Sequence, residues 1–158
     1  MSNQQRIALF PGSFDPFTIG HQDIVERSLP MFDKIIIAIG YNSDKQGFFT
    51  LEDKIAWIEK TFEGNSKIEV KSYEGLTVDY CNKIGAQFLL RGLRTAADFE
   101  YERAIAQMNK KMHPHIESVF LLTAPEHTPI SSTIVRDIIR HGGDASEFLP
   151  KGVKINTL

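Results

Sequence analysis

One short stretch near the start of the chain holds the residues best suited to phosphate chemistry. It follows the apolar run Ile7–Phe10 and reads Pro-Gly-Ser-Phe-Asp-Pro-Phe-Thr-Ile-Gly-His from Pro11 to His21. A strand that leads through a glycine-containing turn into a helix presents backbone N–H groups and a helix N-terminus to a phosphate. The Ser13 hydroxyl and the His21 imidazole belong to this stretch. The pattern therefore predicts a site for the polyphosphate of a nucleotide.

The same stretch has an alternative interpretation as a strand-to-helix turn that binds no ligand. A single histidine in the first turn of a helix is more often structural than catalytic, and His21 alone favours that interpretation. The spacing is more specific than a lone GxGxxG fingerprint, which it does not match, and no Gly-Lys-Ser/Thr follows as in a Walker A loop. Gly12 and Gly20 are expected to allow close backbone approach or a positive φ.

A second cluster, Arg91-Gly92-Leu93-Arg94, comes directly after an apolar run. An arginine that leaves a buried strand needs an anionic partner, because an unpaired buried charge is costly. The structural alternative is an ion pair with Glu100 or Glu102, and for either arginine alone the two interpretations are evenly matched. Two arginines beside a glycine favour phosphate binding, since guanidinium groups hold phosphate bidentately, and Lys45 adds a mobile point charge.

A third cluster, Ile130-Ser131-Ser132-Thr133-Ile134-Val135-Arg136, begins the last predicted helix. Hydroxyl residues at a helix start often form a capping box, but the acidic partner three residues later is absent here. Hydroxyls and free N–H groups at a helix N-terminus suit the β- and γ-phosphates of a nucleotide instead.

Size and composition restrict the class of protein. The chain has 158 residues, 42% hydrophobic residues and a formal net charge of -2, which argues against nucleic-acid binding driven by overall charge. A single cysteine, Cys81, excludes an internal disulfide and makes a structural zinc site improbable. No signal peptide or membrane span is evident, so we expect a cytoplasmic protein with no membrane or nucleic-acid partner.

Alternating strand and helix patterns predict a single α/β domain over residues 1–158, with a five-stranded parallel sheet flanked by helices in a Rossmann-like arrangement. Ile134, Val135, Ile138 and Ile139 are expected to face inward from the last helix. The predicted strands are Arg6–Phe10, Lys34–Ile39, Lys67–Tyr73 at an edge, Gln87–Leu90 and Ser118–Leu122. The predicted helices are His21–Met31, Leu51–Phe62 with Thr50 as N-cap, Leu76–Ile84, Ala96–Met112 and a last helix through Arg140.

Each chemical candidate follows a predicted strand. Ligands of such folds bind beyond the carboxyl ends of the strands, near the point where strand order reverses. We therefore expect five loops to meet at one edge of the sheet and to place His21 and Arg91 in one site.

These motifs resemble those of a known superfamily and, more closely, those of one family within it. Thr18-Ile19-Gly20-His21 resembles the T/HxGH motif of the nucleotidylyltransferase superfamily. Together with the Arg91–Arg94 cluster, the following Asp98-Phe99-Glu100-Tyr101-Glu102 and Ile130–Thr133, it is similar in order and separation to the motifs of the bacterial phosphopantetheine adenylyltransferase family. The resemblance implies reversible adenylyl transfer from ATP to 4′-phosphopantetheine, which gives dephospho-coenzyme A and pyrophosphate in coenzyme A synthesis.

The resemblance also implies roles for individual residues. Ser13 stands where many members have threonine, and His127 stands at an often aromatic position. The implied catalytic residues are His21, Lys45 and Arg91, and the implied acceptor-binding residues are Ser13, Lys45, Thr77, Arg91 and Asn109. The implied ATP-binding residues are Ser13, Phe14, His21, Gly92, Leu93, Arg94, Glu102, His127, Thr128, Pro129, Ile130, Ser131, Ser132 and Thr133.

A phosphate monoester is already a nucleophile, so in-line attack on the α-phosphorus needs positioning and charge neutralisation, with no general base and no covalent intermediate. Mg²⁺ is expected to accompany ATP through phosphates and water, without a protein metal site. The resemblance further implies a homohexamer and feedback inhibition by coenzyme A. The alternatives are another adenylyl- or cytidylyltransferase of the superfamily, or a non-catalytic nucleotide-binding sensor.

Overall fold

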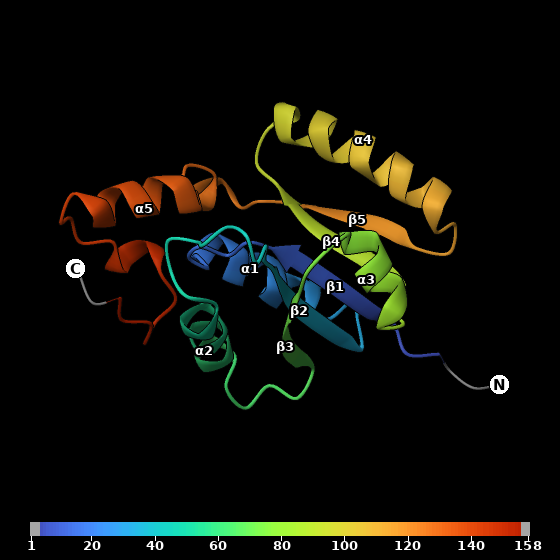
Figure 1. The fold of residues 1–158 in the computed structure, drawn as a ribbon, viewed down its shortest axis with the longest axis horizontal. Helices are drawn as coiled ribbons and strands as arrows, with labels where there is room; N and C mark the ends of the chain where they lie inside the picture. Colours follow the sequence, from blue (N-terminus) through green and yellow to red (C-terminus); the bar gives the residue numbers. More distant parts are fainter. Residues whose placement is uncertain (1–3, 156–158) are drawn as a thin grey trace.

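A computed structural model describes residues 4–155 and contains one five-stranded parallel sheet with helices on both faces (Figure 1). The strand order is β3-β2-β1-β4-β5, and every pair is parallel. The predicted fold class is therefore confirmed, and so is the edge position of the third strand. The strands are β1 (Ile7–Gly12), β2 (Lys34–Gly40), β3 (Ile68–Tyr73), β4 (Phe88–Leu93) and β5 (Glu117–Leu122).

The sheet separates two hydrophobic clusters because successive side chains of a strand point to opposite faces. Ile35, Ile37 and Ile39 of β2 pack on the face covered by α1 (Ile19–Ser28) and α2 (Leu51–Thr61). Leu9 and Ile36 pack on the other face, against α3 (Thr77–Lys83). A central strand that is apolar on both sides, as in Lys-Ile-Ile-Ile-Ala-Ile-Gly, is typical of a parallel sheet covered on both faces.

The two remaining helices lie further from this core. Figure 1 shows α4 (Ala96–Met112) standing over β4 and β5, and none of the residues that the structure places in α4 is buried. Tyr101 and Met108 on α4 are 70% and 58% exposed. Helix α5 (Ser132–Arg140) packs through Val135 and Ile139 on a separate cluster that includes Ala145 and Leu149.

Three predicted details are wrong. The fourth strand does not end at Leu90, because its pairing with β5 continues to Leu93 and so includes Arg91 and Gly92. The first helix begins at Ile19, two residues before His21, since Thr18 caps it, and it ends at Ser28. Ile134 does not face inward: it is 54% exposed, because only one face of α5 contacts the protein and that face carries Val135 and Ile139.

None of the helices in the described part of the chain is both long and apolar enough to cross a membrane.

We predict that the thiol of Cys81 is unreactive in the folded protein. Cys81 is fully buried, and burial raises the pKa of its thiol to about 12, so the nucleophilic thiolate is scarce at pH 8. Labelling by Ellman's reagent should be at least about 100-fold slower in buffer than in 6 M guanidinium chloride. A native labelling rate equal to the denatured rate would contradict the burial of this side chain.

Candidate active site

The site lies at the carboxyl edge of the sheet, where the strand order reverses. The chain passes from β1 to β2 and β3 on one side, then returns to β4 and β5 on the other side of β1. Beyond the ends of β1 and β4 lie two neighbouring cavities, of about 300 and 280 Å³. Both are lined by Arg91, Tyr101 and Glu102. This edge is the candidate active site because it lies where the strand order reverses and because its two cavities share lining residues.

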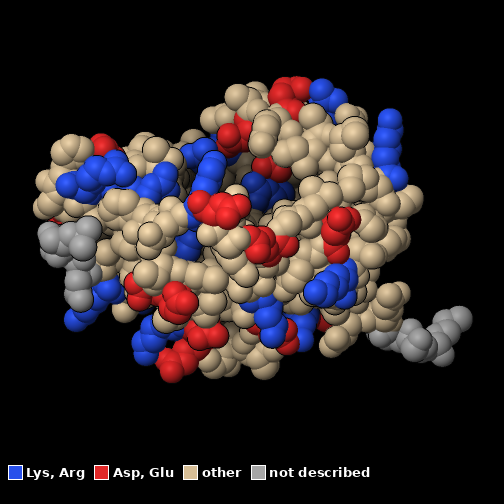
Figure 2. Space-filling view, in the orientation of Figure 1, with Lys and Arg blue, Asp and Glu red and all other residues tan. Residues whose placement is uncertain are grey.

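The first cavity lies between the start of α1, the end of β4, the first turns of α4 and the start of α5. In Figure 2, basic side chains lie in a hollow on the side of the molecule shown, with acidic side chains at its edge. The lining residues are Thr18, Gly20, His21, Ile24, Arg91, Arg94, Asp98, Tyr101, Glu102, Thr123, His127, Ile130, Ser131, Ser132 and Thr133.

His21 is held by a capping box at the start of α1. The Thr18 backbone N–H donates to His21 Nδ1 at 3.0 Å, and the His21 N–H donates to Thr18 Oγ1 at 3.4 Å. Because Nδ1 accepts a hydrogen bond, the neutral ring carries its proton on Nε2. His21 thus has a structural role as the partner of Thr18, and this role does not exclude a ligand, since Nε2–H remains available as a donor.

The electrostatic surroundings keep His21 uncharged. Burial of the ring, and to a lesser extent the positive charges of Arg91 and Arg94, lower the pKa of His21 from 6.5 to about 4. At neutral pH the ring is therefore a neutral hydrogen-bond donor.

Two helix N-termini line the first cavity, one from α1 at Gly20 and His21 and one from α5 at Ser132 and Thr133. The first backbone N–H groups of a helix have no intrahelical acceptor, and the helix dipole favours an anion beside them. Of the five α-helices in the described chain, α1 and α5 alone lack an acidic residue in the first turn. Both helix ends that lack their own carboxylate therefore line the first cavity, whereas the first turn of α4, which also lines it, carries Asp98.

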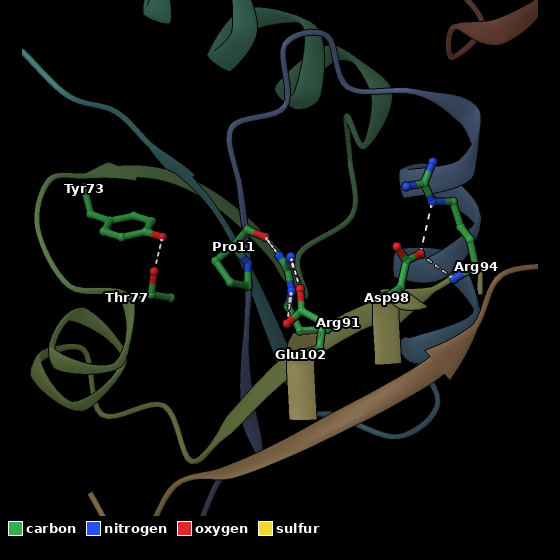
Figure 3. Close-up of polar contacts among 7 residues, drawn as sticks. All are labelled: Pro11, Tyr73, Thr77, Arg91, Arg94, Asp98 and Glu102. Atoms are coloured by element: carbon green, nitrogen blue, oxygen red, sulfur yellow. Dashed lines mark hydrogen bonds and ion pairs between the residues drawn. The ribbon is translucent and has the colours of Figure 1, made fainter. Parts of the chain in front are cut away.

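Arg91 lines both cavities, and Figure 3 shows its guanidinium group between Pro11 and Glu102. Its Nε and Nη2 donate to the Glu102 carboxylate at 3.2 and 2.8 Å, and its Nη1 donates to the Pro11 carbonyl at 2.6 Å. The ion-pair alternative that the sequence left open is therefore present for Arg91. Arg94 pairs instead with Asp98, through Nε at 3.3 Å, and Figure 3 shows its terminal nitrogens pointing away from that carboxylate.

The second cavity is a largely apolar groove between α3 and α4 over the sheet. Leu89, Ile105 and Phe120 supply apolar wall, whereas Ser13, Thr77 and Asn109 place polar groups along it. Such a lining fits a long ligand with polar groups spaced along an apolar chain. The remaining lining residues are Pro11, Gly12, Gly40, Tyr73, Arg91, Tyr101, Glu102, Ala106 and Ser118.

The predicted site residues divide between these places. His21, Arg94, Glu102, His127 and Ile130–Thr133 line the first cavity; Ser13, Thr77 and Asn109 line the second. Arg91 and Glu102 line both, so His21 and Arg91 share a wall of the first cavity. Six predicted residues line neither cavity: Phe14, Lys45, Gly92, Leu93, Thr128 and Pro129.

Some of these six have a structural explanation. The Phe14 ring is buried 5.1 Å from the His21 ring, and Phe14 adopts a positive φ of 44°. A Cβ on Gly12 would lie 2.8 Å from that ring, so Gly12 is needed for this close approach. Gly92 allows β4 to pack on α1, since a Cβ there would lie 3.1 Å from Ile24. Lys45 lies in an exposed loop after β2.

Gly20, unlike Gly12, is not required by a close approach or by a positive φ. An added Cβ would meet no atom closer than 3.5 Å, so the described protein leaves room for a side chain there. Its nearest neighbours would be the Thr18 hydroxyl and His127, which both line the first cavity.

Two residues that support the site were given no role from the sequence: Lys54, and Arg136, which was named only as the end of the third cluster. The buried Lys54 of α2 donates from Nζ to the Ser13 carbonyl at 3.1 Å, and Arg136 of α5 donates to the Asp15 carbonyl at 2.8 Å. A signal for Lys54 was available, because it lies on the same helix face as Leu51 and Ile58. Arg136 offered no such signal.

Within residues 4–155, no group of three or more His, Cys, Asp and Glu side chains is placed to hold a metal ion.

Comparison with known proteins gives a consistent result. Residues 9–138 match the Cytidylyltransferase-like family model. A phosphopantetheine adenylyltransferase of Flavobacterium psychrophilum is 55% identical over 150 residues, which cover 95% of this chain and 99% of that protein. The corresponding protein of Flavobacterium johnsoniae is 53% identical over 150 residues, which cover 95% of this chain and 98% of that protein.

Among solved structures, a bifunctional NMN adenylyltransferase/ADP ribose pyrophosphatase from Francisella tularensis aligns with a TM-score of 0.73 at 15% identity. The alignment covers 95% of this chain and 46% of that protein, so this chain spans just under half of its length. At this identity the likeness shows a shared fold alone.

We predict that His21 makes stability fall as pH drops from 6.5 to 4. The unfolded chain binds a proton in this window and the folded one does not, so the free energy of unfolding declines by up to about 3 kcal/mol. His21→Gln keeps an acceptor for the Thr18 N–H and does not titrate, so it should lose less stability. Urea unfolding at pH 7, 5.5 and 4.5 measures the difference; parallel curves for the two proteins would contradict the lowered pKa.

Proposed function

The chain belongs to the cytidylyltransferase-like family and, within it, to the phosphopantetheine adenylyltransferases, and we propose that it transfers the adenylyl group of ATP to 4′-phosphopantetheine. The products are dephospho-coenzyme A and pyrophosphate, which places the reaction in coenzyme A synthesis. The observation that carries this proposal is the pair of cavities that share Arg91 as a wall. One offers helix N-termini for a triphosphate, and the other offers a long groove for an acceptor.

The first cavity is proposed to bind ATP. The N–H groups at the start of α5, that of Ser132 included, and the hydroxyls of Ser131 and Thr133 suit the β- and γ-phosphates, and Arg94 lies in the same cavity. Ile130 and His127 are available to contact the adenosine portion. The remaining predicted ATP-binding residues line neither cavity, and they are assigned to this site because their backbone lies next to it in the chain: Phe14, Gly92, Leu93, Thr128 and Pro129.

The second cavity is proposed to bind the acceptor. Arg91 lines both cavities, so the acceptor phosphate would meet the α-phosphate of ATP beside it, and Ser13 of the second cavity is assigned to the same phosphate. Thr77 and Asn109 lie along the groove and are assigned to the pantetheine arm.

The reaction then needs positioning more than proton transfer. The acceptor phosphate is already anionic, so it can attack the α-phosphorus in line without a general base. His21, neutral and held by Thr18, donates from Nε2 to an α-phosphate oxygen, and Arg91 stabilises the negative charge on the acceptor side. The step forms one P–O bond and breaks the bond to pyrophosphate, so no covalent enzyme intermediate is required.

Lys45 is proposed to add positive charge beside the reacting phosphates. It lies in the exposed loop between β2 and α2, and Ser43 of that loop donates to the Glu74 carboxylate from N at 2.8 Å and from Oγ at 2.7 Å. These bonds tie the loop to the segment that carries Thr77. Lys45 is assigned to catalysis and to the acceptor phosphate from a loop outside the two cavities.

The proposal also covers the metal ion, the location, the assembly and the regulation of the enzyme. Mg²⁺ is proposed to enter with ATP, and the activity is proposed to be cytoplasmic because its nucleotide substrate is. We also propose a homohexamer, supported by the exposed apolar side chains Tyr101, Met108 and Leu122, the last 73% exposed. Feedback inhibition by coenzyme A is proposed because its pantetheine arm would fit the acceptor groove.

The decisive test is pyrophosphate release from ATP in the presence of Mg²⁺ and each of two acceptors. We predict turnover with 4′-phosphopantetheine and at least about 100-fold lower kcat/KM with nicotinamide mononucleotide, because the groove is apolar and long. CTP in place of ATP serves as the matched donor control. Preference for another acceptor would indicate a different transferase of the family, and release with none would indicate a nucleotide-binding sensor.

We predict that His21→Ala lowers kcat by about 10²–10³-fold, because one donor to the developing charge is lost. His21→Gln keeps the capping box and removes the imidazole, so it should lose kcat as well while retaining the helix cap. Steady-state kinetics and thermal unfolding of both variants separate the two roles. Near-normal turnover in His21→Ala would remove His21 from the mechanism.

A further inference from the structure

Tyr73, at the carboxyl end of β3, is a residue of the second cavity to which no role has been assigned. Its side chain is buried, and its ring stacks on Tyr80 with centroids 4.7 Å apart and planes 9° apart. Its hydroxyl lies 2.7 Å from Thr77 Oγ1, and Figure 3 shows the two hydroxyls facing each other. A Cβ on Gly40 would lie 3.1 Å from the Tyr73 hydroxyl, so Gly40 leaves room for it at the end of β2.

This arrangement fixes the Thr77 hydroxyl. A threonine hydroxyl rotates freely unless a partner holds it, whereas the Tyr73 ring is held by the stack on Tyr80 and by burial. Each hydroxyl has one proton, and the bond between them uses one of the two. The pair therefore offers the cavity one O–H donor together with oxygen lone pairs that accept.

An amide is the group that matches this pair. A peptide-like amide has one carbonyl acceptor and one N–H donor, and both must be satisfied when it enters a largely apolar groove. The groove that Tyr73 and Thr77 line also has the apolar side chains Leu89, Ile105 and Phe120 in its wall. A hydroxyl pair that both donates and accepts is thus suited to an amide in this part of the groove.

We propose that Tyr73 is a positioning residue, which holds the Thr77 hydroxyl so that the pair hydrogen-bonds an amide of the acceptor's arm. The inference rests on the proposed function, since it takes the second cavity as the acceptor site. Tyr73 sets acceptor affinity and has no part in adenylyl transfer or in ATP binding.

The test is Tyr73→Phe, which removes the hydroxyl and keeps the ring that stacks on Tyr80. The KM for 4′-phosphopantetheine should rise about 5- to 10-fold, while kcat and the KM for ATP stay within about twofold. Thr77→Val should raise the same KM, and the double variant should be little worse than either single one, because both act through one hydrogen-bonded pair. Tyr80→Phe is the matched control, since it removes a hydroxyl from the same stack outside the cavity, and it should leave all constants unchanged.

A second acceptor separates recognition from a general structural effect. A simple alkyl phosphate has the reacting phosphate without any amide, so its kcat/KM should be equal in the wild type and in Tyr73→Phe. An equal loss with the alkyl phosphate, an equal rise in the KM for ATP, or an unchanged KM for 4′-phosphopantetheine would each overturn the proposal. These outcomes require a wild type that turns over 4′-phosphopantetheine, and a wild type that does not would instead overturn the proposed function on which the inference rests.

Discussion

The end of β1 and the turn from β1 to α1 depend on side chains that donate hydrogen bonds to their backbone carbonyl oxygens. Arg91 donates to the carbonyl of Pro11, Lys54 to that of Ser13 and Arg136 to that of Asp15. Ser132 adds a fourth bond, from its hydroxyl to the Pro16 carbonyl at 2.8 Å. These donors come from β4, α2 and α5, so elements distant in the sequence hold one short turn. Because these carbonyl oxygens accept hydrogen bonds from the protein, the turn presents less negative charge to a bound anion.

This arrangement explains how a chain with net charge -2 can offer a phosphate site. The positive potential is local, from two helix ends and from the Arg91 and Arg94 guanidinium groups, and needs no basic surface. The same charges help to keep His21 neutral, since a third positive group in the cavity would be repelled. The histidine therefore contributes a directed donor, and the helix ends and arginines contribute the charge.

Much of this was predictable from the sequence, because the patterns involved are local. The apolar run of β2 and the Thr50 cap each identify an element without knowledge of the rest of the fold, and the parallel sheet brings the loops to one edge. The end of β4 was not predictable, since Arg91 and Gly92 break the apolar pattern and only the pairing with β5 extends the strand. The partner of Arg91 depended likewise on how α4 lies over the sheet, which no local pattern determines.

The ion pair of Arg91 raises the question of how a residue already paired can also bind a phosphate. A guanidinium group has five N–H donors, and the bonds to Glu102 and Pro11 use three of them. Two donors remain on the terminal nitrogens, so a phosphate can bind without releasing Glu102, whose carboxylate is only 13% exposed and would be costly to leave unpaired. A lysine has three donors on one nitrogen and could not hold the same partners and a phosphate together. The planar geometry of arginine thus lets one side chain fasten α4 to the sheet and still face both cavities.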